Sequence, residues 1–251
     1  MKEFSSEFGQ SYHTYSFGYC NYALYEKGDD LSVIYDKGYL PFSGSSDIRN
    51  AFYMSRSARI PLRHFHESSE NRRIEKRFHN AFKRKVTPLD KFDWDNKEFI
   101  SFCTKYFSMR HGPAVMPEKR IRHILKCGLV THIVSYADKD NKIVGYVFEI
   151  SDSKLSHFWF SFYDLSYVYR SLGVWLMLDC LRHAKVKGKE YFYVGTVYGE
   201  KALYKSNFNP IEFWNGIEWV KDVKKLKSRS RSDEERIIHG KDEWKEEINI
   251  F

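Results

Sequence analysis

The sequence lacks the patterns that mark the commonest metal, secreted and membrane proteins. Its four cysteines, Cys20, Cys103, Cys127 and Cys180, form no C-x-x-C pair, which argues against a zinc or iron–sulfur clip. No apolar run approaches the roughly 20 residues of a membrane helix, and the polar N-terminus is unlike a signal peptide. No Ser-His-Asp or Cys-His array is visible. We therefore expect a cytoplasmic protein with no membrane partner, no metal and no cofactor.

Aromatic residues and positive charge are what the chain has in excess. It carries 20 Phe, 18 Tyr and 6 Trp in 251 residues, which is enough apolar surface for a folded core. Its formal net charge is +8 and its sequence pI about 9.1. A basic surface favours an acidic partner such as nucleic acid, an anionic membrane or an acidic protein. Many soluble proteins are mildly basic without such a partner, so charge alone leaves the question open.

Hydrophobic periodicity predicts a mixture of helices and strands. The predicted helices are 68–85, 94–110, about 117–125 and 171–187, and the predicted strands are 129–137, 142–150, 155–163 and 191–196. Val86–Asp90 is predicted to be a linker. We expect an N-terminal α+β unit (1–90), a second unit (91–222) and a polar, charged tail (223–251), partly helical or disordered. Helices, an antiparallel meander, a long helix and a strand, in that order, are typical of a GNAT-like α+β acyltransferase core.

The segment 68–85 has a basic face. Arg72, Lys76 and Lys83 fall on one side of the predicted helix, and Arg73 and Arg77 lie beside them. Such a face either follows the phosphates of a nucleic acid or is simply solvated, and the sequence leaves both interpretations open.

The most informative stretch is Tyr191–Thr196 followed by Ala202–Pro210. It predicts a buried aromatic strand, a short crossing segment, and then Lys205 between Tyr204 and Phe208 just before a turn. A lysine in that setting suits a site that handles a polyanion, although a surface lysine remains the alternative.

Several segments together resemble one family, the aminoacyl-tRNA–protein transferases, in particular arginyl-tRNA–protein transferase and the bacterial aspartate/glutamate leucyltransferases. The segments that carry the resemblance, which spans about residues 15–220, are Gly18-Tyr19-Cys20, Gly38-Tyr39 with Ser43-Gly44, Arg59-Ile60-Pro61-Leu62 through Phe65, Arg110-His111, Tyr163-Asp164 with Arg170-Ser-Leu-Gly173, Tyr191–Gly195, Tyr204-Lys205 with Phe208, Pro210 and Glu212, and Trp219. The block around Tyr191–Glu212 is the most specific of these.

The chain also departs from the family pattern. Phe17 stands where the first cysteine of the C-G-Y-C motif belongs, and Leu40-Pro41 replaces the Arg-Arg pair of a later motif. The downstream cysteine positions, near Phe52 to Ser57, hold no cysteine. A divergent member is therefore expected, and the sequence leaves its donor and its acceptor open.

The resemblance implies transfer of an amino acid, of arginine or leucine type, from charged tRNA to the amino group of a protein or peptide. An aminoacyl ester is already activated, and the α-amine that attacks it has a pKa of about 8. The enzyme then has to align two partners and stabilise an oxyanion. Two other interpretations remain: transfer to a specialised peptide or small molecule, and a non-catalytic RNA- or protein-binding module.

We assign candidate roles on that basis, each with a structural alternative. Lys205, Tyr204, Tyr193 and Asp164 are the catalytic candidates, and Arg59, Arg72, Arg73, Lys76, Arg77, Arg110, His111, Arg170 and Ser171 are the candidates for binding substrate or tRNA. The alternatives are a core role for the tyrosines, a cap or turn for Asp164, and solvated or structural positions for the rest. The turn Arg170–Gly173 has one glycine, fewer than a coenzyme A pyrophosphate site usually has, so we expect no coenzyme A.

Overall fold

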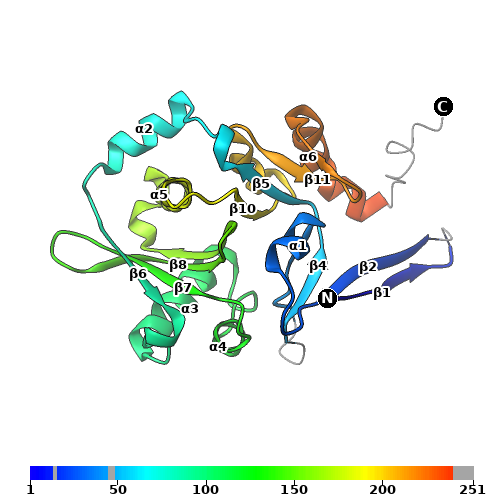
Figure 1. The fold of residues 1–251 in the computed structure, drawn as a ribbon, viewed down its shortest axis with the longest axis horizontal. Coiled ribbons are helices and arrows are strands. Elements are labelled where there is room, and N and C mark those ends of the chain that lie inside the picture. Colours follow the sequence, from blue (N-terminus) through cyan, green and yellow to red (C-terminus); the bar gives the residue numbers. More distant parts are fainter. Residues whose placement is uncertain (14–15, 45–48, 240–251) are drawn as a thin grey trace.

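The strands form two sheets, which are arranged as drawn in Figure 1. A computed structural model describes residues 1–13, 16–44 and 49–239. The smaller sheet has the order β1-β2-β4-β3, made of Lys2–Ser11, Ser16–Leu24, Ala51–Met54 and Tyr39–Pro41. The larger sheet has the order β12-β11-β5-β10-β9-β8-β7-β6, made of Trp219–Val220, Glu212–Trp214, Ser57–Pro61, Tyr191–Thr196, Leu155–Tyr163, Ile143–Ser151, His132–Ala137 and Lys83–Pro88.

The sheets do not divide at residue 90, where we placed the boundary between two units. Strand β5 (Ser57–Pro61) already belongs to the larger sheet, between β11 and β10, and every residue of β5 is buried. Val86–Asp90 is not a linker either, because β6 (Lys83–Pro88) pairs with β7 along its whole length. The β-branched Val86 and Thr87 suit this half-buried strand.

The centre of the larger sheet confirms the expected α+β class and order of elements. Strands β7, β8 and β9 form an antiparallel meander, and helix α5 (Leu172–Val186) then returns the chain to β10. Strand β10 pairs with β9 in parallel. The larger core cluster includes Leu176, Leu178 and Leu181 of α5, so the helix is held on the sheet by apolar contact.

Strands β9 and β10 pair over only the first part of their length and then diverge. Their pairing runs from Tyr191 opposite Leu155 to Tyr193 opposite His157 and then stops. The register of β10 against β5 shifts between Tyr193 and Gly195, and that of β9 against β8 shifts beside Phe158. Bulges of this kind bend a strand away from its neighbour. The space that opens between the two strands positions the site described below.

The helices follow the predicted pattern, with two corrections. Their bounds are α1 Leu31–Asp36, α2 Ser69–Phe78, α3 Lys97–His111, α4 Glu118–Lys126, α5 Leu172–Val186 and α6 Val223–His239, with 3-10 turns η1 Leu62–His64, η2 Leu89–Lys91, η3 Leu165–Arg170 and η4 Glu200–Asn207. Ser68 caps α2 in a capping box with Asn71. The helix predicted over 68–85 ends at Phe78, because the chain turns through Asn80 with φ of 54°. Lys83 therefore lies in β6, off the helix.

Residues 223–239 of the predicted polar tail form helix α6, whose first turns pack on the core. In α6 the side chain of Leu226 is fully buried, and Arg229 and Ser230 are buried beside it. Asp233 accepts hydrogen bonds from Arg56 Nη1 (2.9 Å) and from the Gly199 backbone N–H (2.7 Å), which ties α6 to the core. Residues 240–251 of the predicted tail lie outside the described residues.

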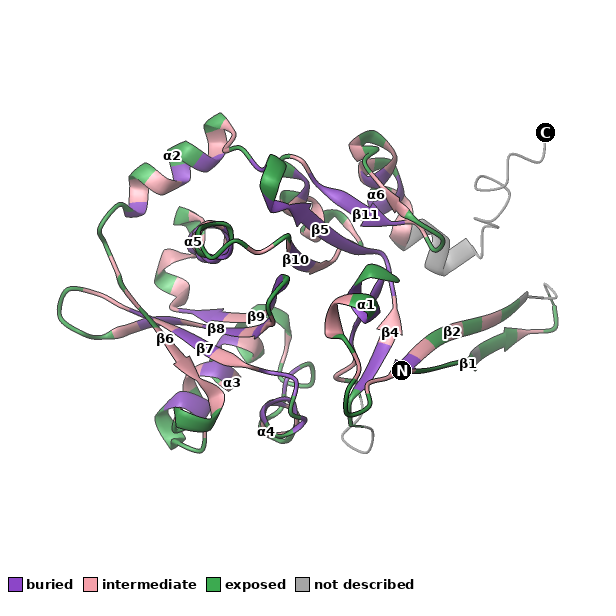
Figure 2. Cartoon of the chain, viewed as in Figure 1, coloured by how far each residue is buried: buried purple, intermediate pink, exposed green. Residues whose placement is uncertain are grey.

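Burial is concentrated in the larger sheet, as Figure 2 shows for β5 and β11, whereas the β1–β2 hairpin is mostly exposed. Of the helices in the described part of the chain, none has the length and apolar character needed to cross a membrane.

Candidate active site

A cavity of about 720 Å³ opens where β9 and β10 diverge. Its walls come from β3, β9, β10, η4 and α3, together with the first residues of α5. Aromatic and apolar side chains make one part of the lining, namely Tyr106, Phe107, Phe158, Trp159, Phe160, Tyr163, Val174 and Met177. The space is large enough for an amino-acid side chain together with part of a nucleotide.

The polar part of the lining is cationic. Four side chains with permanent or usual positive charge face the cavity, and two histidines accompany them; they are Arg110, Arg120, Lys201, Lys205, His111 and His157. Among the described residues, no aspartate or glutamate lines the cavity. A cavity lined by cations and by no carboxylates attracts an anion or a developing negative charge.

Lys205, the central sequence candidate, lies at this cavity. Its Nζ donates a hydrogen bond to the Thr196 carbonyl oxygen (2.8 Å), across the bend in β10. No carboxylate pairs with it in the described part of the chain. Desolvation therefore lowers the pKa of Lys205 to about 8, because burial disfavours an unpaired ammonium.

Tyr204, Arg110 and His111 line the same cavity. Although 39 % of Tyr204 is exposed, desolvation and then Tyr163 raise the pKa of its phenol to about 12, so its hydroxyl stays protonated at neutral pH. Desolvation, Arg110 and Lys201 lower the pKa of His111. His111 is therefore mostly a neutral imidazole at neutral pH.

The remaining catalytic candidates lie outside the cavity lining. Tyr193 is 1 % exposed, and its ring contacts Tyr35 and Trp219 at 4.7 and 5.8 Å between centroids. Asp164 caps η3 by accepting a hydrogen bond from the Ser166 backbone N–H (2.9 Å). These placements correspond to the structural alternatives, a core tyrosine and a cap aspartate.

Arg59 is likewise engaged elsewhere. Its Nε donates to Glu212 (2.8 Å) and its Nη1 contacts Asp36. The guanidinium lies between the rings of Tyr191 and Trp219, 3.9 and 4.0 Å from their centroids. A buried, paired and stacked arginine stabilises the junction of β5, β10 and β11, so it is poorly placed to take an acceptor or a phosphate.

The turn before α5 contributes one of its two candidates to the cavity. Ser171 and Gly173 line it, and Ser171 has φ of 66° at the start of the helix. A Cβ on Gly173 would lie 2.8 Å from the Tyr163 ring, so the glycine lets the helix approach that tyrosine. Arg170 is outside the lining, where its guanidinium lies near the rings of Phe78 and Tyr167.

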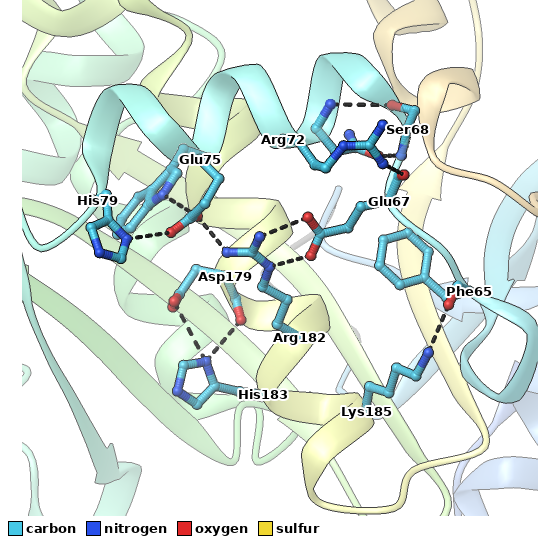
Figure 3. Close-up of polar contacts among 12 residues, drawn as sticks. Phe65, Glu67, Ser68, Arg72, Glu75, His79, Asp179, Arg182, His183 and Lys185 are labelled. Carbon is cyan, nitrogen blue, oxygen red and sulfur yellow. Dashed lines mark hydrogen bonds and ion pairs between the residues drawn. The ribbon is translucent and has the colours of Figure 1, made fainter.

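Helix α2 has an acidic side that faces α5 and a basic side that faces solvent. Figure 3 shows Arg182 of α5 taking both oxygens of Glu67 (2.7 and 2.8 Å) and contacting Glu75. The carboxylates at this interface are thus paired with α5. Arg72 and Lys76 are exposed.

The other two basic candidates of α2 are occupied. Arg73 pairs with Glu70 on the same helix, and Arg77 Nη1 donates to the Arg170 carbonyl oxygen (2.7 Å). Of these α2 cations, only Arg73 pairs with a carboxylate in the described part of the chain. Arg72, whose Nη1 donates to the Glu67 carbonyl oxygen (2.6 Å), and Lys76 are the two that are exposed without such a pair.

Sequence reasoning missed His157 and Arg120. His157 is one polar residue in the apolar run of β9, and no spacing distinguishes it from a core histidine. Arg120 follows Lys119 in a basic helix, and nothing in the sequence distinguishes one cation of this helix from another as a cavity residue. Only the divergence of β9 from β10, which brings distant segments to one space, gives these two residues a place in the cavity.

No group of three or more His, Cys, Asp or Glu side chains suited to a metal ion occurs among the residues that the structure describes. Three of the four cysteines are buried, and Cys20 is half-buried in β2.

Comparison with known proteins agrees with the resemblance seen in the sequence. Residues 64–215 match the family described as "Arginine-tRNA-protein transferase, C terminus". A protein named aspartate/glutamate leucyltransferase from Ruegeria pomeroyi is 28% identical over 171 residues, which cover 65% of this chain and 60% of that protein. One of the same name from Methylorubrum extorquens is 30% identical over 141 residues, covering 49% of this chain and 56% of that protein. The match thus spans about 60% of the length of the first of these relatives.

Solved structures with a similar trace include the C-terminal domain of a putative lysylphosphatidylglycerol synthetase from Agrobacterium fabrum, with a TM-score of 0.43, 15% identity, and coverage of 66% of this chain and 50% of that one. Another is FemX, with a TM-score of 0.43, 9% identity, and coverage of 66% and 59%.

Proposed function

Because the chain belongs, through residues 64–215, to the family described as "Arginine-tRNA-protein transferase, C terminus", we propose that it transfers an amino acid from charged tRNA to the amino group of a protein or peptide. The observation that carries the proposal is the cationic cavity where β9 and β10 diverge, with Lys205 in its wall. Aminoacyl esters and terminal phosphates are the substrates that such a wall suits.

The reaction needs positioning more than acid–base chemistry. The acceptor amine attacks the ester carbonyl carbon, and negative charge develops on the carbonyl oxygen before the ribose oxygen leaves. Donors fixed in a desolvated cavity stabilise that charge with little reorganisation. Lys205 and the protonated hydroxyl of Tyr204 are donors of this kind.

Of the two donor classes that the family resemblance implies, a neutral side chain of leucine type fits better than arginine. An arginyl side chain needs a carboxylate partner, and no described lining residue carries one. The apolar wall made by Phe158, Trp159 and Val174 suits an aliphatic chain. The relatives named leucyltransferases support the same choice.

The acceptor is proposed to carry an acidic N-terminal residue. Arg120 donates to the Val115 carbonyl oxygen (2.7 Å) and the Ser43 hydroxyl (3.0 Å), and it pairs with no carboxylate in the described part of the chain. Desolvation lowers its pKa, and its buried Nε lacks a hydrogen-bond partner. A carboxylate entering the cavity would satisfy this guanidinium.

A panel of charged tRNAs against peptides tests the function directly. Peptides with N-terminal Asp, Glu, Gln or Ala would be incubated with leucyl-, arginyl- and methionyl-tRNA, and the products weighed by mass spectrometry. We expect leucine added to Asp and Glu peptides, at least tenfold faster than from arginyl-tRNA. Binding of tRNA without any extended peptide would instead indicate a non-catalytic module.

The exposed face of α2 is proposed to contact the tRNA. Replacing Arg72 and Lys76 by glutamate should weaken tRNA binding and reduce the slope of log K against log salt by about 1 to 2, since each lost phosphate contact removes about 0.7 to 0.9. Reversal of Lys91 and Lys97, exposed at η2 and the start of α3, is the matched control. Equal effects from the two pairs would mean that α2 acts only through net charge.

A further inference from the structure

His157 lies in the wall of the cavity, and the family resemblance gave it no role. Its side chain is 1 % exposed. One ring nitrogen, Nδ1, lies 2.8 Å from the Tyr35 hydroxyl oxygen. The other, Nε2, is buried and has no hydrogen-bond partner among the described residues. A buried polar atom left without a partner costs stability, so its retention calls for a ligand or a task.

The Tyr35 hydroxyl fixes which nitrogen carries the proton. Tyr35 is fully buried, and burial raises the pKa of its phenol well above the usual value, so the hydroxyl keeps its proton. Its one hydrogen bond in the described part of the chain is the one with His157. We therefore assign the hydroxyl as donor to Nδ1, which leaves the ring proton on Nε2.

Gly195 keeps open the space that Nε2 faces. A Cβ at residue 195 would lie 3.8 Å from His157 Nε2 and 3.6 Å from Lys205 Nζ, so both nitrogens lie within 4 Å of one point. Gly195 has φ of 81°, which also favours glycine. The His157 donor on β9 and the Lys205 donor in η4 thus lie around a position that Gly195 leaves without a side chain.

We propose that His157 Nε2–H and Lys205 Nζ–H together bind the carbonyl oxygen of the aminoacyl ester, making His157 a catalytic residue and Tyr35 a positioning residue. This inference rests on the proposed function, because that function supplies the ester. It goes further in naming the atoms that receive the developing charge.

The step balances without proton loss from either donor. The acceptor nitrogen forms a bond to the carbonyl carbon, and the π electron pair moves to oxygen, where the two N–H groups hold it. The electron pair then returns to re-form the carbonyl, and the bond from carbon to the ribose oxygen breaks. That oxygen takes a proton from the acceptor nitrogen, which became positively charged when it bonded to the carbon. The products are an amide and a tRNA with a free terminal hydroxyl.

A neutral imidazole suits this role. Desolvation and the Lys205 charge lower the pKa of His157 to about 3, so the ring adds a donor without adding a second charge beside the ammonium. The two donors therefore hold an oxyanion without repelling each other as two cations would.

The test compares His157→Leu with His157→Gln, whose amide retains an N–H donor. With leucyl-tRNA and an acidic peptide at saturation, we expect kcat to fall about 100-fold in His157→Leu, because loss of one oxyanion donor costs about 10²–10³. We expect the kcat of His157→Gln to be at least tenfold higher than that of His157→Leu. The KM for the peptide and the affinity for tRNA should stay within threefold.

The outcomes distinguish a failure of this inference from a failure of the proposed function on which it rests. No transfer by the unaltered protein from any charged tRNA would overturn the proposed function itself. Transfer by the unaltered protein with kcat of His157→Leu within threefold of it would overturn the role of His157 alone. Equal losses in the Leu and Gln variants would also overturn it, since a donor would then not matter.

Tyr35→Phe supplies a measurement that does not depend on a buried histidine being replaceable. Nitrogen-15 NMR of the histidine rings should show the His157 proton on Nε2 in the unaltered protein and a mixture of both tautomers in Tyr35→Phe. The kcat of that variant should fall several-fold in parallel. A proton found on Nδ1 in the unaltered protein would overturn the assignment.

Discussion

Replacing Lys205 by methionine is expected to lower the rate of aminoacyl transfer by about 10²–10³ while leaving the fold intact. Methionine is unbranched like lysine and one atom shorter, and it removes the ammonium, so the change tests charge more than packing. The loss should appear in single-turnover rates with pre-bound charged tRNA, because the ammonium acts on charge that develops during the reaction.

The same change is not expected to lower the melting temperature at pH 7. The pKa of Lys205 is about 8 in the folded protein against 10.5 for a free lysine. The unfolded chain therefore binds more protons between these values, and stability from this group rises with pH through that window. Below pH 8 the buried charge opposes folding, so an apolar replacement removes a cost. If the methionine variant both unfolds and fails to transfer, the effect of the lost charge is not separated from the effect of the lost fold. Lys205→Gln would then be tested in its place.

Lys205→Arg adds a pH dependence with a definite sign. If the ammonium is required, activity of the unaltered protein should fall as pH rises through about 8, the pKa of Lys205. An arginine stays protonated, so this alkaline limb should disappear in Lys205→Arg even where the maximal rate is lower. The control is the acidic limb set by the acceptor amine, which should be unchanged. An alkaline limb that persists in Lys205→Arg would assign it to another group.

Much of the fold was predictable because it rests on local patterns. The meander, α3, α4, α5 and β10 have strong periodicity, and Gly188, with φ of 72°, follows the end of α5. The errors came where tertiary pairing overrides local signals. Val86–Asp90 contains a proline and an aspartate that suggest a linker, yet β7 provides a partner strand. The charged sequence of α6 gives little sign of the apolar contacts that Val223 and Leu226 make with the core, or of the ion pair between Arg56 and Asp233.

The cavity was predictable only in part. The position of Lys205 between aromatic residues gave a local signal, and the structure places it in the cavity wall. Tyr193 carried the same signal, but its buried ring packs in the smaller core cluster with Tyr35, outside the cavity lining. The partner of His157 is 122 residues away in sequence, at Tyr35, so no local pattern announces it.

The stability of the fold should be especially sensitive to one added methyl group at Gly38, where the two sheets meet. Gly38 follows α1 with φ of 80°, and a Cβ there would lie 2.3 Å from the Trp214 ring of β11. Just beyond it, Leu40 and Pro41 line the cavity. Gly38→Ala therefore strains the backbone and forces Trp214 away at the junction that supports this wall.

Gly28→Ala separates the two effects, because Gly28 has φ of 99° and nothing within 4 Å of an added Cβ. Backbone strain alone should cost about 1 kcal/mol in Gly28→Ala. Strain with overpacking should cost about 3–4 kcal/mol in Gly38→Ala. At about 2–4 °C per kcal/mol for a chain of this size, the melting temperature should fall about 10 °C in Gly38→Ala and about 3 °C in Gly28→Ala. Equal shifts in thermal unfolding would mean that Trp214 yields freely and that the two sheets are not rigidly joined there.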